Sequence, residues 1–299
     1  MAAPAAALKA IPAPISPSRL AFRRAWRHGS IVFGGAVLLL MIVAALAAPL
    51  LAPHDPYAQD LSRRFITPIW GAKATWEHVL GTDALGRDYL SRLIYGARIS
   101  LLIGFATTML SGIIGTALGV VAGYFGGRVD LAVNFLITTR LTLPVVLVAL
   151  VVVAVVGSSL PILILIIGLL LWDRFAVVTR SATQQVASRD FVASAKAIGC
   201  STPRILWQEI LPNIMNSLIV VATVEMAHAI LLEAALSFLG LGVQPPLPSW
   251  GLMVAEAKAY LFFNPSLIAI PGTTLFLLIL AINLIGDGIR DVTAPEGRA

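Results

Sequence analysis

Residues 187–214 read ASRDFVASAKAIGCSTPRILWQEILPNI, and this polar segment separates two long apolar runs, 160–179 and 210–239. A helix needs about 20 apolar residues to cross a bilayer core of about 30 Å. Both runs reach this length. The composition agrees, because 58% of the residues are hydrophobic, only 12% are charged, and the mean hydropathy is +0.90. The sequence therefore predicts an integral membrane protein.

Four further apolar runs complete a set of six predicted membrane spans. The runs are continuous and lack the alternation of a barrel strand, and lipid allows the backbone only helices or closed barrels. An all-α membrane protein with six transmembrane helices is therefore expected. The predicted spans are 31–52, 99–123, 141–156 with a possible start within 129–139, 160–179, 210–239 and 266–285.

Basic residues near the spans indicate the orientation, because Lys and Arg gather on the cytoplasmic side of a membrane. They are densest before the first span, at Arg19, Arg23, Arg24 and Arg27, so both termini are predicted to be cytoplasmic. The same asymmetry explains the net charge of +6 without a nucleic-acid partner. The predicted organisation is a cytoplasmic tail (1–30), a first transmembrane helix (31–52), an extracytoplasmic loop with an interfacial helix (53–98), a transmembrane core (99–290) with a cytoplasmic loop (187–210), and a second cytoplasmic tail (291–299).

Several enzyme motifs are missing from the sequence. It contains no G-x-x-x-x-G-K-[ST], no H-E-x-x-H, no G-x-S-x-G and no pair of cysteines. The histidines His28, His54, His78 and His228 are scattered without the spacing of metal ligands. A membrane enzyme is therefore disfavoured, and neither a catalytic residue, a metal site nor a bound cofactor is expected on this chain.

The first half of the polar segment has the pattern of a short helix. Ser188 is expected to cap this helix, and Asp190 in its first turn suits the positive end of the helix dipole. Phe191, Ala195 and Ile198 recur at i, i+4 and i+7, which gives a narrow apolar face.

The second half predicts another short helix after a glycine. Gly199 permits the left-handed turn that ends a helix, Pro203 fits the first turn of the next one, and Pro212 marks the start of the fifth span. Two interpretations of the segment stay open. It is either an amphipathic loop lying on the lipid headgroups or a rigid knob that docks into a groove on a soluble partner.

The segment also resembles a known family. D-F-V-A-S-A-K-A-I-G (190–199), followed by I-L-P (210–212), is similar to the EAA loop of ABC importer permeases, the coupling helix that docks on the ATPase. Ala193 replaces the glutamate of the family and Ser194 its first alanine, whereas Ala195 and Gly199 match. By resemblance, the residues expected to couple to the ATPase are Asp190, Phe191, Val192, Ala193, Ser194, Ala195, Gly199, Pro203 and Pro212.

Three more stretches, 81–101, 236–251 and 283–291, closely resemble the C-type permease subunits of bacterial dipeptide and oligopeptide ABC importers. The resemblance implies a type I permease fold and half of a peptide pathway through the cytoplasmic (inner) membrane. It also implies a homologous B-type permease, two ATP-binding subunits that use ATP and Mg, and an extracytoplasmic peptide-binding protein as partners. An ion-coupled secondary transporter or channel subunit and a purely structural subunit are the alternatives. The cargo stays open among dipeptides, longer peptides, nickel, opines and glycopeptides.

Ionisable residues within the predicted spans are candidates for the translocation path, because such residues are costly in lipid and usually face a cavity or a partner. Glu225 and His228 are one turn apart and can interact, whereas the adjacent Asp173 and Arg174 point apart and need separate partners. Glu233 is expected near the path or the outer gate. Two alternatives remain: Glu233 bonded to a neighbouring helix, and Asp173 and Arg174 at the inner membrane boundary.

The segment 82–97 is expected to form the interfacial helix that leads into the second span. Thr82 or Asp83 can cap it, and Asp88 with Arg92 is an acid-before-base pair at i, i+4. A structural elbow and a seat for the binding protein are the two roles considered.

Overall fold

The computed structural model describes residues 25–72 and 74–293, and this part of the chain is helical without a β-strand. Arg19, Arg23, Arg24 and most of the predicted C-terminal tail lie outside the described residues. The helices are α2 (Gly29–Leu46), α3 (Ala48–Leu51), α4 (Tyr89–Phe125), α5 (Gly127–Thr142), α6 (Val145–Val156), α7 (Leu160–Leu170), α8 (Trp172–Ala187), α9 (Asp190–Ala197), α10 (Thr202–Arg204), α11 (Leu211–Phe238), α12 (Trp250–Ala257) and α13 (Ser266–Thr293), with 3₁₀ turns at Leu61–Arg63 (η1) and Lys258–Tyr260 (η3) and a π-helical turn at Ile205–Ile210 (η2).

Five helical stretches among the described residues are long and apolar enough to cross a membrane: 29–46, 89–125, 160–187, 202–238 and 266–293. A sixth span forms if α5 and α6, which are bent by 85° relative to each other, count as one. The all-α membrane fold is confirmed, but the third span is not the single straight helix expected. Pro144 precedes α6, and proline cannot continue the hydrogen bonding of a helix.

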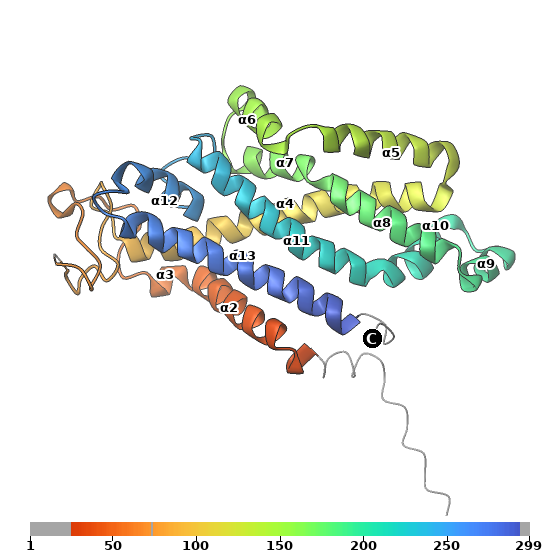
Figure 1. The fold of residues 1–299 in the computed structure, drawn as a ribbon, viewed down its shortest axis with the longest axis horizontal. Helices are drawn as coiled ribbons and strands as arrows, with labels where there is room; N and C mark the ends of the chain where they lie inside the picture. Colours follow the sequence, from red (N-terminus) through yellow and green to blue (C-terminus); the bar gives the residue numbers. More distant parts are fainter. Residues whose placement is uncertain (1–24, 73, 294–299) are drawn as a thin grey trace, which may run out of the picture.

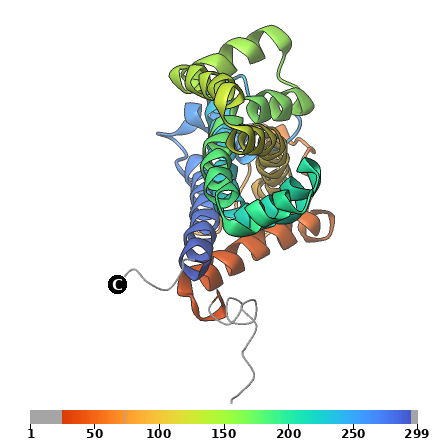
Figure 2. The ribbon, with the colours of Figure 1, turned by 90° about the vertical axis from the view of Figure 1, so that its right-hand side faces the viewer.

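The two ends of the helix bundle carry different loops. In Figure 1, α9 lies at the same end as the start of α2 and the end of α13, whereas the segment between α3 and α4 and helix α12 lie at the opposite end. This grouping agrees with the predicted topology, although which end faces the cytoplasm stays a prediction. Viewed from the α9 end in Figure 2, α4 and α8 are central, with α2 on one side and α5 and α6 on the other.

Helices α4 and α8 pack at close range along a row of glycines. Gly115, Gly119 and Gly123 are successive turns of α4, and a Cβ atom on each would lie 2.2 to 2.6 Å from a carbonyl oxygen of α8. Helices in lipid associate by close packing, and small residues let their backbones approach. The row therefore fixes the position of α8, and with it the charged residues at the start of that helix.

Helix α4 begins later than expected and is not preceded by a separate interfacial helix. It runs unbroken from Tyr89 to Phe125. Asp88 is its cap, since Oδ2 of this side chain accepts the backbone N–H of Ser91 at 2.7 Å. Thr82 and Asp83, the expected caps, lie in the turn before the helix. The predicted start and caps of this helix are therefore wrong, and residues 89–97 are the first turns of α4, one helix of 37 residues. The position of these turns at the membrane interface stays a prediction.

Candidate functional site

The predicted cytoplasmic loop, residues 187–210 and called the coupling loop below, contains one separate helix rather than two. This helix is α9, and it follows Arg189; Ser188 does not cap it, because its hydroxyl donates to the carbonyl of Gln185 at 2.9 Å. The second predicted helix is the beginning of a long one, since α10, η2 and α11 run without a break from Thr202 to Phe238.

Pro203 occupies the first turn of this long helix, as predicted. Pro212 lies in the first turn of α11, as predicted for the start of the fifth span, and the helix from Thr202 continues into α11 without a break. Proline has no N–H to donate, and the turn before it is widened so that the N–H of Leu211 bonds to the carbonyl of Leu206. A π-helical turn thus joins the start of α11 to the helix that precedes it.

The end of α9 has the geometry predicted from Gly199. Gly199 has φ of +85°, in the left-handed region. Its N–H bonds to the carbonyl of Lys196, and the N–H of Cys200 bonds to that of Ala195, both at 3.0 Å. These two bonds form a Schellman motif, which fixes the direction of the chain as it leaves the helix.

Helix α9 is held to the rest of the chain by a residue outside the predicted apolar face. Val192 is fully buried and packs in a cluster with Ile205 of the π-helical turn. Phe191 and Ile198, by contrast, are 42% and 82% exposed, and only Ala195 of the predicted face is partly buried. The two large apolar side chains are therefore available to a partner or to lipid.

The small residues of the coupling loop are also on its surface. Ala193 and Ser194 are exposed, as is Asp190. The Nζ of Lys196 lies 4.7 Å from the ring centroid of Tyr124 near the end of α4, a cation–π contact that adds a second attachment of α9 to the bundle. Helix α9 is thus a fixed element with a small, mixed outer surface.

The fourth and fifth spans are joined by a charged group of Arg174, Glu225 and His228, called the span charge group below. Oε1 of Glu225 lies 3.5 Å from Nε of Arg174 and 3.3 Å from Nδ1 of His228. Nδ1 of His228 is also 3.1 Å from Nη1 of Arg174, so it accepts from the guanidinium or donates to the carboxylate according to its tautomer. Glu225 is 1% exposed, and a buried carboxylate within a span needs such a cation.

A break in the fourth span positions two of the predicted residues. Helix α7 ends at Leu170 and α8 begins at Trp172, so Asp173 lies in the first turn of α8. Asp173 is buried, and its carboxylate is at a helix N-terminus, where the dipole favours negative charge. Arg174 follows it and reaches Glu225 on the fifth span, a pairing across spans that the sequence alone does not show.

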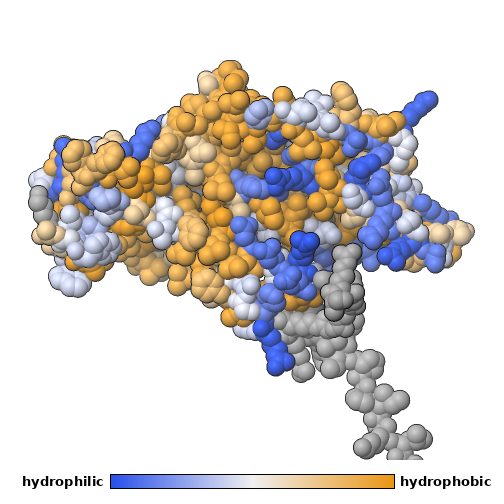
Figure 3. Space-filling view, in the orientation of Figure 1, coloured by the Kyte–Doolittle hydropathy of each residue, from blue (hydrophilic) through white to orange (hydrophobic). Residues whose placement is uncertain are grey.

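An open cavity of about 800 Å³ lies beside the span charge group. Its charged lining residues are Arg174, Glu225 and Arg290, and Asn216 and Ser217 add polar groups to an otherwise mainly apolar wall. In Figure 3, hydrophilic residues interrupt the apolar surface in the region of α8 and α11. The cavity is open on the surface of this chain.

Glu233 lies on the same helix but in a different environment. It is fully buried, and its Oε1 accepts hydrogen bonds from the hydroxyls of Ser237 at 2.7 Å and Ser249 at 3.0 Å. Ser249 in turn caps α12 by accepting the N–H of Leu252. Eight residues separate Glu233 from Glu225, about 12 Å along a helix. The geometry of Glu233 is that of an anchor for the loop and helix after α11.

A buried ion network near the start of α4 replaces the predicted pair of Asp88 and Arg92. Arg92, 1% exposed, instead contacts Asp83, and its Nη1 lies 2.8 Å from Oε2 of Glu256 on α12. Arg87 contacts the same two carboxylates, with Nε 2.6 Å from Oδ2 of Asp83. The predicted pair is wrong because Arg92 is engaged by Asp83 in the preceding turn and by Glu256, which is distant in the sequence.

Comparison with known proteins adds two family matches. Residues 115–297 match the family described as binding-protein-dependent transport system inner membrane component. Residues 16–68 match the N-terminal TM domain of oligopeptide transport permease C.

The chain is similar along most of its length to curated proteins. It is 41% identical over 287 residues to the di/tripeptide transport system permease protein DppC of Pseudomonas aeruginosa, with 95% of each chain covered. It is 39% identical to the dipeptide transport system permease protein DppC of Haemophilus influenzae, over 87% of this chain and 88% of the other. Among solved structures, an inward-facing form of the MetNI methionine ABC transporter has a similar fold, with a TM-score of 0.57 and 19% identity over 69% of this chain and 98% of that chain.

Proposed function

Because this chain belongs to the family of binding-protein-dependent transport system inner membrane components, we propose that it is a permease subunit of a peptide ABC importer in the cytoplasmic membrane. The names of its relatives support di- or tripeptides as the cargo class. The chain is a transport subunit, and the bond-breaking step of the cycle, ATP hydrolysis with Mg, belongs to partner subunits.

The pathway itself is formed with a second permease. The open cavity beside Arg174 and Glu225 supports this, because it has walls from α8, α11 and α13 but lies on the surface of this chain. A homologous B-type subunit placed against this face closes the cavity into a pathway. The span charge group then lies on the wall of the pathway, where charged residues contact the backbone termini of a peptide.

The coupling loop is the proposed docking site for one of two ATP-binding subunits. The observation that carries this is the contrast within α9: Val192 is fully buried, whereas Phe191 and Ile198 face outward. Docked against an ATPase, these two side chains bury apolar surface, and the continuous helix from Thr202 transmits a displacement to Glu225. An extracytoplasmic peptide-binding protein seated at the opposite end completes the importer.

The experiment is co-purification of the ATP-binding subunits with this chain, carrying either Ile198→Arg or Ile198→Leu. Ile198 is 82% exposed, so neither change disturbs the isolated fold. Full burial of an isoleucine contributes about 1.5 to 3 kcal/mol, so the arginine is expected to weaken docking by about 10- to 100-fold and the leucine to leave it intact.

Peptide uptake in proteoliposomes supplies the second readout. ATP-dependent uptake that falls with Ile198→Arg and persists with Ile198→Leu supports the proposal. Equal retention of the ATPases by both variants contradicts docking through Ile198. If no ATPase associates with the unaltered chain and an ion gradient drives uptake, the secondary-transporter alternative is correct.

A further inference from the structure

We propose that His54, His78 and Asp88 form a binding site for a divalent transition-metal ion of the zinc class, in the segment between α3 and α4. The sequence spacing of the two histidines gives no indication of it, because 24 residues separate them. The fold brings them to the same carboxylate. One ligand atom from each of the three side chains lies within 4.8 Å of the other two.

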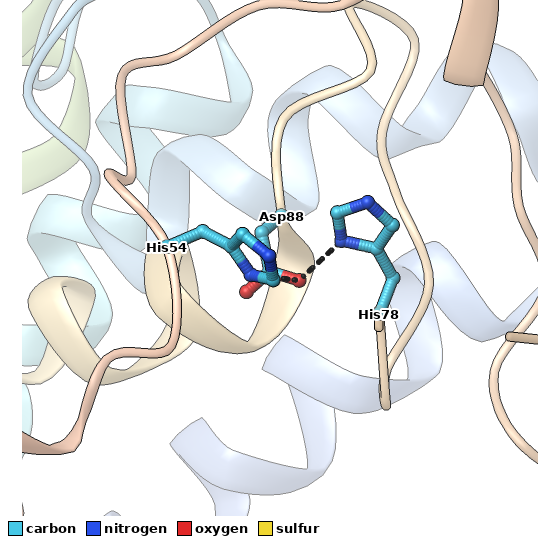
Figure 4. Close-up of side chains that lie close together, drawn as sticks. All are labelled: His54, His78 and Asp88. Carbon is cyan, nitrogen blue, oxygen red and sulfur yellow. Dashed lines mark hydrogen bonds and ion pairs between the residues drawn. The ribbon is translucent and has the colours of Figure 1, made fainter. Parts of the chain in front are cut away.

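The three side chains converge on one oxygen atom. Nδ1 of His78 lies 2.9 Å and Nδ1 of His54 lies 3.7 Å from Oδ1 of Asp88. Two ligands held about 2.0 to 2.1 Å from a tetrahedral ion are about 3.4 Å apart, between these two values. Figure 4 shows both rings beside the carboxylate, with the histidines coming from different parts of the loop and Asp88 from the start of α4. The three ligand atoms, which lie within 4.8 Å of one another, must approach to about 3.4 Å, so the widest separation closes by up to about 1.4 Å when the ion binds.

The two carboxylate oxygens of Asp88 contact different groups. Oδ2 accepts the N–H of Ser91 and caps α4. Oδ1 is hydrogen-bonded to Nδ1 of His78 at 2.9 Å, and an ion bound between these two atoms would replace the shared proton. The hydroxyl of Ser91 accepts the backbone N–H of His54 at 3.1 Å, so the first ligand is tied to the same turn of the helix. The backbone of His54 and the carboxylate of Asp88 are therefore held in place by hydrogen bonds to Ser91.

Two imidazole nitrogens in the cluster lack a hydrogen-bond partner among the described residues. They are Nδ1 of His54 and Nε2 of His78, and both atoms are buried. His78 and Asp88 are almost fully buried as residues, at 5% and 2% exposure. A buried polar atom without a partner is destabilising, and a metal ion that takes the lone pair of His54 removes one such cost.

The surroundings favour a cation, and the donor set favours zinc over calcium or magnesium. A cavity of about 180 Å³ beside the cluster is also lined by Asp55, Asp60 and Glu77, against the single guanidinium of Arg63. Imidazole nitrogens suit zinc and its neighbours, whereas calcium and magnesium prefer oxygen ligands throughout. Two histidines and one aspartate leave a fourth tetrahedral position for a water molecule from the cavity.

Bound metal would join three segments that are distant in the sequence. His54 lies just after α3, His78 lies in the middle of the loop, and Asp88 begins α4. The ion would thus link the loop to the first turn of α4, on the surface predicted to face outside the cytoplasm. The site is independent of the proposed peptide transport.

The test uses the full chain purified without a polyhistidine tag, stripped with EDTA, and equilibrated with Zn²⁺ by dialysis. The unaltered chain is expected to bind one equivalent, and His54→Gln is expected to weaken that binding at least tenfold. His54→Gln is the decisive variant, because the His54 side chain is one-third exposed and its Nδ1 has no hydrogen-bond partner among the described residues. His28→Gln removes a histidine far from the cluster and serves as the matched control, with no loss expected.

A second variant, Asp88→Asn, and a chemical-modification experiment on the unaltered chain complete the test. Asparagine keeps the cap of α4 but lacks the carboxylate charge, so this variant should fold and lose the zinc. In the unaltered chain, Zn²⁺ should slow the modification of the partly exposed His54 by diethyl pyrocarbonate and leave His28 unaffected. Equal zinc binding by the unaltered chain and His54→Gln, or no protection at micromolar Zn²⁺, overturns the proposal.

Discussion

The close contact between α4 and α8 predicts that Gly119→Ala destabilises the protein, although alanine forms helices better than glycine does. A Cβ atom at this position would lie 2.6 Å from the carbonyl oxygen of Ala176, 2.8 Å from Cβ of Thr179 and 2.9 Å from the amide nitrogen of Arg180. Two of these are backbone atoms, so rotating a side chain does not relieve the contact. Helix α8 must move away by about 0.5 to 1 Å to reach an ordinary van der Waals separation.

The expected change in the free energy of unfolding combines two opposing contributions. Overpacking a well-packed interior costs about 1 to 3 kcal/mol, and the upper end applies because backbone must move. Replacing a glycine inside a helix by alanine contributes about 0.5 to 1 kcal/mol in the other direction. The net loss is therefore about 2 kcal/mol. Gly35→Ala in α2 is the matched control, since a Cβ there meets nothing within 4 Å and only the favourable contribution remains.

Unfolding of the two variants in mild detergent, followed by tryptophan fluorescence during a denaturant titration, measures the difference. Gly119→Ala should be less stable than Gly35→Ala by about 2 to 3 kcal/mol. The reasoning is refuted if Gly119→Ala is as stable as Gly35→Ala, because α8 would then accept the added methyl group without cost.

Two further changes probe the charged groups. Arg92→Met removes one cation from the buried network around Asp83 and Glu256, while Arg87 keeps both carboxylates partly paired. The free energy of unfolding should therefore fall by about 3 kcal/mol, the low end for a broken buried pair. A loss below about 1 kcal/mol in the same titration would show that the network contributes little. Glu225→Gln removes the carboxylate that pairs with Arg174 and His228, and we expect peptide uptake to fall by about 10- to 100-fold with assembly unchanged; normal uptake would separate the span charge group from transport.

The spans could be predicted from the sequence because hydrocarbon thickness sets their length directly. The bend before α6 was less accessible: Pro144 is visible in the sequence, but the 85° angle depends on packing. The start of α4 shows a related difficulty. Thr82, Asp83 and Asp88 can all cap a helix, and the choice follows from Asp83 being engaged by Arg92, which itself pairs with a residue on α12.

Some features of the coupling loop were predictable from neighbouring residues, whereas others depend on residues distant in the sequence. Gly199 was predictable because a left-handed turn is a property of one residue and its neighbours. The buried face of α9 was not, since Val192 faces inward only because the π-helical turn and the end of α4 lie beside it. Likewise, the pairing of Arg174 with Glu225 joins two helices whose relative rotation no single-span pattern reveals.

The unbroken helix from Thr202 to Phe238 behaves mechanically as a stiff rod. Its 37 residues extend about 55 Å, so a tilt of about 5° about one end displaces the other by about 5 Å. In the proposed importer, a small displacement of the coupling loop would therefore become a movement of about 5 Å at the other end of the helix, where Glu233 accepts hydrogen bonds from Ser237 and Ser249. The π-helical turn at 205–210 lies between the coupling loop and the rest of this helix, so in the proposed importer the stiffness of this turn sets how much of the displacement reaches the far end.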